Sequence, residues 1–393
     1  MGIKENKSFL LWTPSYYPRF GGLESVTREY ASFVKSRGWE VKIISNKYPL
    51  YLPKLEQIDN IDINRYLFLN RPINYLKNKR LDLFFAYFII KPFTLFRLMF
   101  YFKKNKPNVV NVHFLDNQLI ELVLLHLFLK FDLFVSLHGD EVERLSKIKK
   151  NSFRYILYLR IFNQSKYITF CSSYLLEKFT KTFNNFNKKK LLVVQNGINK
   201  KFIFSNLIEQ KKEYVFSAAR FVPKKGLSML FDIFNSKTVN RLQVAGGRKN
   251  DVPNLASNIS QNIIFLGVLN RKQIINKLKF AKLTIVPSIK EPYGIIVPEA
   301  ICCGSPLVAT NVGGIPEIIN SIRNKLNKHE KKIFDYWVKL VEPDTQSIEI
   351  GVNSIIANTQ PIKRYLELVE NIRSEFLWDK KLQNFFYRLE NFD

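Results

Sequence analysis

The stretch that decides the fold reads Glu291-Pro-Tyr-Gly-Ile-Ile-Val-Pro-Glu299-Ala-Ile-Cys-Cys-Gly304-Ser-Pro306-Leu-Val-Ala-Thr-Asn-Val-Gly313-Gly314-Ile-Pro-Glu317. It follows an apolar run at 283–286, which predicts a buried strand. Gly294 marks a loop, and residues 298–304 predict a short helix that begins at a proline and ends at a glycine. Residues 307–309 predict the next strand. The stretch therefore predicts a strand-loop-helix-strand unit of an α/β sheet.

Two glutamates of this stretch stand eight positions apart. In the predicted unit, Glu291 lies in the loop beyond the carboxyl end of a strand, and Glu299 lies in the first turn of the helix, facing the same crevice. Free amides at a helix start favour an anion there. Either glutamate alone would also fit an ordinary loop acid or a first-turn residue that complements the helix dipole. As a pair, they indicate a clamp for a sugar nucleotide.

The whole stretch resembles the Glu-x7-Glu signature of the family-four retaining glycosyltransferases, which have the two-domain GT-B fold. The residues that match, in family order, are Pro287-Ser288, Gly294, Glu299-Ala300, Gly304-Ser-Pro306 and Gly313-Gly314. The resemblance implies an α/β protein of two Rossmann-like, doubly wound parallel-sheet domains that face a central cleft. It covers nearly the whole chain, most weakly at 48–108 and at 320–339, where lysine-rich, helix-like residues replace a short glycine loop.

Predicted strands alternate with helices in both halves of the chain, as expected for doubly wound parallel sheets. The strands are expected at 9–13, 41–45, 109–112, 133–137, 167–170, 191–194, 214–218, 242–245, 263–266, 283–286 and 307–309. A turn signal at 195–199 indicates a domain junction. We expect an acceptor-binding domain at 1–199, a nucleotide-sugar-binding domain at 200–374, and a helix at 375–393 that crosses back to the first domain.

Transfer from a nucleotide sugar develops negative charge on the leaving diphosphate, which fixed cations or amides must stabilise. Arg220 and Lys225 can approach one diphosphate from the same loop, although they could also be solvated loop cations. Gly22 and Gly246 allow close backbone approach to phosphate, although glycines after strands are more often plain turns. No Asp-x-Asp motif and no His/Cys cluster at ligand spacing occurs, so we expect neither a metal nor a cofactor beside the donor.

The resemblance also implies roles for single residues. Glu299 would accept hydrogen bonds from ribose hydroxyls, and Glu291 would hold the donor sugar and steady positive charge at its anomeric carbon. His138 would lie near donor sugar and acceptor, whereas His113 is expected to be a buried histidine bonded to backbone. The expected catalytic residues are Glu291, His138, Arg220 and Lys225; the expected donor-binding residues are Gly22, Arg220, Lys225, Gly246, Gly294 and Glu299.

Composition limits the other partners. The 61 Lys and Arg against 33 Asp and Glu give a formal charge of +28, which favours anionic surfaces, nucleic acid or phosphorylated small molecules. No nucleic-acid-binding motif occurs, so we do not expect nucleic acid as a partner. Three cysteines form no even framework, and the first seven residues carry charge without a secretory hydrophobic region. We therefore expect a cytoplasmic protein.

Residues 81–102 are about as long as a membrane span but contain Asp82, Lys91-Pro92 and Arg97. Their many phenylalanines and the lysines after them fit an interfacial amphipathic helix, and fit an ordinary core helix equally well. An interfacial helix would place the protein on the inner face of the cell membrane, beside a lipid-linked acceptor.

We expect a retaining, metal-independent hexosyltransferase that moves a sugar from a nucleotide-diphosphate sugar to a glycan or lipid-linked glycan. Surface polysaccharide, lipopolysaccharide or glycolipid synthesis would use such an activity. The alternatives are a sugar-nucleotide epimerase of the same fold, which would lack the full signature, and a non-catalytic basic protein that binds lipid or nucleic acid. A binding protein would leave the glutamate pair with Arg220 and Lys225 unexplained.

Overall fold

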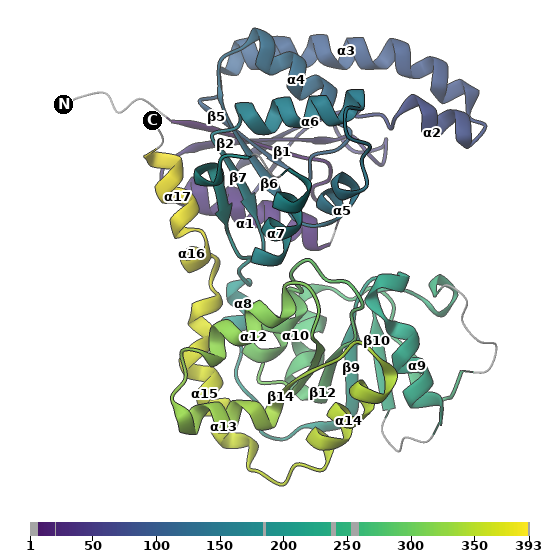
Figure 1. The fold of residues 1–393 in the computed structure, drawn as a ribbon, viewed down its shortest axis with the longest axis vertical. Helices are drawn as coiled ribbons and strands as arrows, with labels where there is room; N and C mark the ends of the chain where they lie inside the picture. The colour runs from purple at the N-terminus through teal and green to yellow at the C-terminus, as the bar shows by residue number, and fades with distance from the viewer. Residues whose placement is uncertain (1–6, 20, 184–185, 237–240, 253–258, 392–393) are drawn as a thin grey trace. The chain divides into compact units, whose positions relative to one another are not determined.

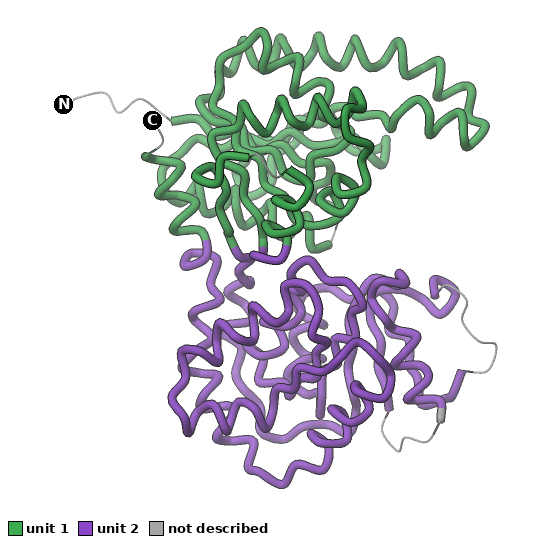
Figure 2. The backbone as a smooth tube through the Cα atoms, viewed as in Figure 1, with its two compact units in different colours: residues 1–171, 175–194, 382–393 green, residues 172–174, 195–381 purple. Residues whose placement is uncertain are grey.

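The structure is a computed structural model that describes residues 7–19, 21–183, 186–236, 241–252 and 259–391. Residues 1–6, which carry most of the N-terminal charge pattern, lie outside the described residues. The chain forms two compact units, shown in Figure 2. Unit 1 consists of Met1–Cys171, Leu175–Val194 and Leu382–Asp393, and unit 2 of Ser172–Tyr174 and Gln195–Lys381.

Unit 1 is built on an eight-stranded sheet with the order β3-β4-β2-β1-β5-β6-β7-β8. The strands are β1 (Ser8–Thr13), β2 (Glu40–Asn46), β3 (Leu55–Ile58), β4 (Ile61–Tyr66), β5 (Val109–His113), β6 (Asp132–Leu137), β7 (Tyr167–Phe170) and β8 (Leu191–Val193). All neighbouring pairs are parallel except β3 and β4. Strand order reverses between β1 and β5, which makes the crevice at their carboxyl ends the favoured ligand position of this sheet.

The helices of unit 1 cover its sheet, and Figure 1 shows α3 as the outermost, beyond α4 and α6. They are α1 (Gly22–Ser36), α2 (Pro72–Lys77), α3 (Leu81–Asn105), α4 (Leu119–Phe128), α5 (Asp140–Ser146), α6 (Phe153–Gln164), α7 (Ser173–Thr182) and α17 (Gln383–Glu390). The last of these packs on the first, since the Phe386 ring lies edge-on to Phe33 with centroids 5.8 Å apart.

Unit 2 is built on a six-stranded, fully parallel sheet with the order β11-β10-β9-β12-β13-β14. Its strands are β9 (Lys212–Ala218), β10 (Arg241–Ala245), β11 (Ile263–Phe265), β12 (Ala281–Val286), β13 (Leu307–Thr310) and β14 (Val338–Val341). Its helices are α8 (Lys200–Ile203), α9 (Leu227–Ser236), α10 (Arg271–Phe280), α11 (Ile296–Cys302), α12 (Ile315–Arg323), α13 (Lys328–Trp337), α14 (Thr345–Ile356), α15 (Ile362–Ile372) and α16 (Trp378–Lys381). The expected α/β class with two doubly wound parallel sheets is confirmed.

Burial explains why β12 and β13 read as continuous apolar runs rather than as alternating ones. Leu283, Val308 and Ala309 are fully buried, and so are Thr284 and Leu307, whose side chains alternate with theirs. Helices cover both faces of a parallel sheet, so both side-chain sets of a central strand need apolar residues. These strands form the core that fixes the loop carrying Glu291.

The lysine-rich segment 320–339 forms the end of α12, all of α13 and the start of β14. A capping box begins α13, where the Asn327 side chain accepts from the Glu330 amide and the Glu330 side chain accepts from the Asn327 amide. The helix buries Phe334 and Trp337. β14 then pairs in parallel with β13, from Val338 opposite Leu307. The segment therefore contributes the edge strand of the sheet, which its lysine-rich sequence did not indicate.

The unit boundaries differ from those expected at 199 and 375. Apart from Ser172–Tyr174, the chain enters unit 2 at Gln195 and returns to unit 1 only at Leu382. The cause lies in contacts within unit 2, where the Ile198 amide donates to the Phe376 carbonyl at 2.8 Å and Gly197 packs against Trp378. These bonds hold both the outgoing and the returning segment in unit 2 for several residues.

Candidate active site

The site of unit 2 lies where its strand order reverses, between β9 and β12. The loops that follow these two strands are bonded to each other, because the amides of Ile289 and Lys290 both donate to the Lys224 carbonyl, at 2.9 and 3.1 Å. Gly226 sits in the left-handed region at φ +67°, and a Cβ there would come within 1.9 Å of the Pro287 carbonyl oxygen. Glycine is therefore required for the two loops to approach.

Glu291 is held by both its side chain and its backbone. Its carboxylate forms a close ion pair with Lys225 and accepts from the Ser288 hydroxyl at 3.2 Å. Its own carbonyl accepts from the Gly314 amide at 3.0 Å. Only 8% of Glu291 is exposed. Lys225, to which the resemblance gave a place on the diphosphate, is paired with the carboxylate of the same site.

The close approach of the backbone to Glu291 explains why glycines occur at positions 294 and 313 of the sequence pattern. Gly294 has φ +90°, and a Cβ there would lie 3.1 Å from Cγ of Glu291. Gly313 has φ +59°, and its Cβ would lie 1.7 Å from the Glu291 carbonyl oxygen. These glycines let the backbone wrap closely around Glu291, so Gly294 shapes the site by packing; its contact with a donor stays a prediction.

Glu299, in the first turn of α11, is buried against Arg271 of α10. Oε1 of Glu299 lies 2.5 Å from Nη1 of Arg271. Burial raises the pKa of Glu299 to about 7, and the neighbouring guanidinium opposes that rise. The Arg271 guanidinium also lies over the Phe202 ring at 5.2 Å. A carboxylate fixed in this way offers its remaining oxygen as a hydrogen-bond acceptor.

Sequence analysis did not identify Arg271 as part of the site. The available signal was its position at the first residue of α10, which follows β11 and begins with a capping box of Asn270 and Gln273. A helix start just beyond a strand lies at the sheet edge where ligands bind. The chain has 61 lysines and arginines, and the sequence alone does not show which of them pairs with Glu299, so this pairing is seen only in the fold.

Arg220 and Gly246 lie at the same sheet edge, because they follow the neighbouring strands β9 and β10. Arg220 is exposed, two residues beyond the end of β9. Gly246 has φ +123°, and a Cβ there would lie 1.9 Å from the Ala219 carbonyl oxygen. Its amide donates to the Gly267 carbonyl at 2.8 Å. Backbone packing thus accounts for Gly246, and a role toward a donor stays a prediction.

Gly22 and His138 belong to unit 1, whereas the other expected site residues belong to unit 2. Gly22 is the exposed first residue of α1, a 15-residue helix that follows β1 at the switch point of its sheet. The N-cap residue is Gly21, which has no side chain that could cap the amides at this helix start. Glu24 in the first turn accepts from the Ser15 hydroxyl at 2.6 Å.

The two expected histidines are bonded to each other at the carboxyl ends of β5 and β6. Asn111 donates its amide to the Ser136 hydroxyl at 3.0 Å, and its Oδ1 lies 2.6 Å from Nε2 of His113. Nδ1 of His113 lies 3.0 Å from Nε2 of His138. His113 therefore bonds side chains, not the backbone partner expected from the sequence.

This chain of bonds fixes the tautomers. Oδ1 of Asn111 can only accept, so His113 carries its proton on Nε2 and accepts at Nδ1 from Nε2–H of His138. Nδ1 of His138 is then unprotonated and carries a lone pair, and this nitrogen has no hydrogen-bond partner among the described residues. Burial lowers the pKa of His138 to about 3 and that of His113 well below its usual value. His138 is thus a neutral acceptor, suited to a hydroxyl donor.

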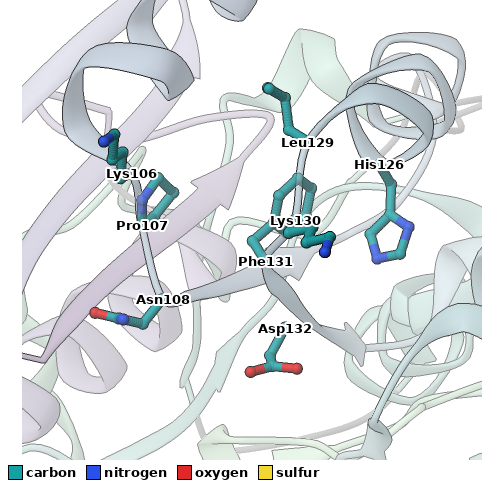
Figure 3. Close-up of a pocket in the computed structure, with 8 residues that line it drawn as sticks. All are labelled: Lys106, Pro107, Asn108, His126, Leu129, Lys130, Phe131 and Asp132. Carbon is teal, nitrogen blue, oxygen red and sulfur yellow. The ribbon is translucent and has the colours of Figure 1, made fainter.

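A separate hollow of about 480 Å³ lies in unit 1 and is drawn in Figure 3. It is lined by Lys106, Pro107, Asn108, His126, Leu129, Lys130, Phe131 and Asp132. Asn108 precedes β5 and Asp132 begins β6, so the hollow lies at the amino ends of these strands. His113 and His138 lie at the opposite edge, and the hollow is not part of the candidate site.

Comparisons with known proteins found a family model that matches each half of the chain. A model described as "Glycosyltransferase Family 4" matches residues 20–202, and one described as "Glycosyl transferases group 1" matches residues 198–333. An uncharacterized glycosyltransferase of Methanocaldococcus jannaschii is 25% identical over 395 residues, which cover 93% of this chain and 94% of that protein.

Two solved structures share the fold over 98% of this chain and 99% of theirs. Sucrose-phosphate synthase from Thermosynechococcus elongatus has a TM-score of 0.72 at 17% identity, and the Anabaena protein HepE in complex with UDP-glucose has a TM-score of 0.71 at 14% identity. The fold is the GT-B fold. Because the two family models follow each other from residue 20 to residue 333, across both parallel sheets, the chain belongs to the family-four, group 1 glycosyltransferases.

Proposed function

We propose that the protein is a retaining, metal-independent hexosyltransferase that uses a nucleotide-diphosphate sugar and a glycan or lipid-linked glycan acceptor. It would act in surface polysaccharide or glycolipid synthesis, from the cytoplasmic side of the cell membrane. The observation that carries this proposal is the pair of buried carboxylates at the switch point of unit 2, each paired with a cation: Glu291 with Lys225 and Glu299 with Arg271.

The geometry supports a donor site in unit 2. Crevices at switch points of parallel sheets bind nucleotides, and the HepE structure with the same fold is a complex with UDP-glucose. Glu299 would accept hydrogen bonds from the ribose hydroxyls through the carboxylate oxygen that is not paired with Arg271. Arg220 and Lys225, on one loop, would neutralise the charge that develops on the diphosphate.

Retention would come from a same-face reaction. The bond between the anomeric carbon and the diphosphate oxygen breaks, the acceptor oxygen bonds to that carbon, and the acceptor proton passes to the leaving diphosphate. Glu291, fixed by Lys225 and Ser288, would hold sugar hydroxyls and stabilise positive charge at the anomeric carbon. His138, neutral with an open Nδ1, would accept a hydroxyl proton in a hydrogen bond rather than act as a nucleophile or acid.

The test combines donor binding with product stereochemistry. The purified chain is titrated by calorimetry with uridine, guanosine and adenosine diphosphate sugars, and the donor that binds is incubated with membrane lipid extract. We expect binding to the sugars of one base and a product with the anomeric configuration of the donor, read by proton NMR coupling constants. An inverted product contradicts retention, and an epimerised free nucleotide sugar contradicts transfer. Glu291→Gln, which keeps size but removes charge, is the control that should bind donor without turnover.

A further inference from the structure

We propose that the outer face of α3 docks on an anionic lipid bilayer, with the helix lying in the plane of the interface. The outer face consists of Phe85, Phe88, Ile89, Phe93, Phe96 and Phe100, each between 57% and 75% exposed. Spacings of three and four residues place these six side chains on one side of the helix. Single exposed apolar residues are ordinary, but a contiguous stripe along one helix marks an interaction site.

The opposite side of α3 is fixed to unit 1. Nζ of Lys91 lies 2.5 Å from Oε1 of Glu121 in α4, and it donates to the Asn117 carbonyl at 3.1 Å. Leu98 and Phe102 are buried, and the Phe102 ring lies 5.3 Å from that of Phe131. Of the residues of α3, only Lys91, Thr94, Leu98 and Phe102 are buried, so the helix is fixed to unit 1 through its C-terminal half and the stripe lies on its uncovered side.

The ion pair of Lys91 with Glu121 argues against a spanning helix and favours an interfacial one. Leu81–Asn105 is the one helix in the described part of the chain that is long and apolar enough to cross a membrane. A spanning helix would be surrounded by lipid, which would strip Lys91 from its buried carboxylate partner and expose that carboxylate. Lying flat, the helix keeps this pair and inserts only its outer face into the boundary of headgroups and acyl chains.

The positive charge around α3 favours an anionic lipid surface as the partner of its outer face. Between Lys77 and Lys106 the chain has eight basic side chains and one acidic side chain, Asp82, which pairs with Arg80. Lys77 and Lys79 are exposed before α3, and Lys103, Lys104 and Lys106 are exposed at its end. Basic residues that flank an apolar stripe fit an anionic surface. A second copy of the chain would instead place two strongly positive faces against each other.

The lipid surface is argued from α3 alone, and only the inference that the same lipid carries the acceptor rests on the proposed function. The test is co-sedimentation of the full chain with vesicles of pure phosphatidylcholine and with an equal mixture of phosphatidylcholine and phosphatidylglycerol. We expect sedimentation with the mixed vesicles and partial release by high salt. Salt screens the lysines beyond about 8 Å at physiological strength, but it does not weaken the inserted rings.

Two sets of variants separate the contributions. Phe88→Ser, Phe93→Ser and Phe96→Ser together should abolish the salt-resistant fraction, whereas the matched set of exposed aromatics elsewhere, Phe204→Ser, Tyr336→Ser and Tyr387→Ser, should not. Neutralising Lys103, Lys104 and Lys106 to glutamine should lower partitioning by roughly two orders of magnitude. The same change at the exposed Lys328, Lys332 and Lys363 should lower it far less, because these residues lie in unit 2, outside the α3 segment.

Several outcomes would overturn the proposal. The proposal is wrong if the wild-type chain fails to sediment with mixed vesicles. It is also wrong if alkaline carbonate does not release the bound protein, because that resistance would indicate a spanning helix. Early melting of the triple serine variant would show that its rings are core; Leu98→Ser, on the buried side, supplies the comparison for such a loss. A wild-type dimer that this variant dissociates would assign the face to a second copy. Nucleotide-sugar binding, measured without vesicles, reports separately on the proposed function.

Discussion

Glu299 is a carboxylic acid whose charge changes in the range where enzymes are assayed. Burial raises its pKa from 4.5 to about 7, so the folded chain takes up a proton on Glu299 as the pH falls through 7. The protonated acid offers a weaker acceptor to ribose. We expect donor affinity measured by calorimetry to fall below pH 7, by roughly tenfold for each pH unit until the lost hydrogen bonds, worth about 1–3 kcal/mol, are exhausted.

Glu299→Gln is the control for this pH dependence, because glutamine keeps the shape and cannot titrate. The variant should bind donor more weakly at pH 8 and with no inflection near pH 7. An unchanged inflection in the variant would assign the proton to another group. Equal affinity of wild type and variant at pH 8 would remove Glu299 from the donor site.

Arg220→Ala and Lys225→Ala should differ in their effects on stability, although we propose both residues as partners of the diphosphate. Arg220 is exposed, so Arg220→Ala should change the free energy of unfolding by less than about 0.5 kcal/mol while lowering turnover on the order of a hundredfold. Lys225→Ala leaves the buried Glu291 without its cation and should cost roughly 1–3 kcal/mol. Thermal unfolding and steady-state rates of both variants measure the two effects.

The double variant Lys225→Ala, Glu291→Ala supplies the check on this pair. Removing both charges avoids an unpaired buried carboxylate, so it should recover part of the stability lost by Lys225→Ala alone. Simple addition of the two single losses would show that the ion pair contributes nothing to the fold.

His138 should stay neutral and in one tautomer across the working pH range. Burial lowers its pKa to about 3, and the acceptor Nδ1 of His113 holds the proton on Nε2. Long-range proton–nitrogen NMR on the free protein should show the Nε2–H tautomer from pH 5 to pH 8, about the range where an ordinary histidine titrates. Titration of His138 near 6.5 would show that the bonded, buried arrangement is not kept in solution.

At the scale of elements, α17 is a structural part of unit 1 although it stands at the end of the chain. Phe385 is fully buried, with its ring 5.1 Å from Tyr30 of α1 and 5.9 Å from Phe134 of β6. We expect Phe385→Ala to destabilise the protein by about 3–5 kcal/mol, the usual loss for a buried phenylalanine. Tyr387→Ala, on the exposed side of the same helix, is the matched control and should cost less than about 0.5 kcal/mol in chemical denaturation.

The central strands could be predicted from the sequence because their burial on both faces leaves an apolar run in each. β12, expected at 283–286, is observed at Ala281–Val286, and β13, expected at 307–309, is observed at Leu307–Thr310. The antiparallel pair β3 and β4 was missed. β3 alternates half-buried and exposed residues, and β4 carries Asp62, Asn64 and Arg65, so neither forms an apolar run.

Those residues of the candidate site that lie close together in the sequence could be predicted from it. Glu291, Gly294, Glu299 and Gly313 lie on one strand-loop-helix-strand unit, and their spacing expresses the geometry of that unit. The cations that neutralise the glutamates come from elsewhere: Lys225 is 66 residues from Glu291, and Arg271 is 28 residues from Glu299. Such pairs depend on which strands become neighbours, and a single sequence with 61 basic residues does not identify them.

For the molecule as a whole, the expected independence from metal ions is directly testable. Arg220 and Lys225 would take the place of a divalent cation on the diphosphate. We therefore expect transfer activity to survive prolonged treatment with EDTA at an unchanged rate. Complete loss of activity, restored by manganese, would contradict the metal-free mechanism while leaving the family placement intact.

The discontinuous make-up of unit 1 has a consequence for how the protein is made. Its sheet is finished when Val193 leaves the ribosome, but α17, which supplies Phe385, is translated after all of unit 2. Domains usually fold in the order of their synthesis. Here the first domain lacks α17 until all of unit 2 has been made, and until then Tyr30 and Phe134 lack their contact with Phe385. A chain released from the ribosome after residue 381 should therefore show a protease-resistant unit 2 and a still-sensitive unit 1, reversing the usual order of maturation.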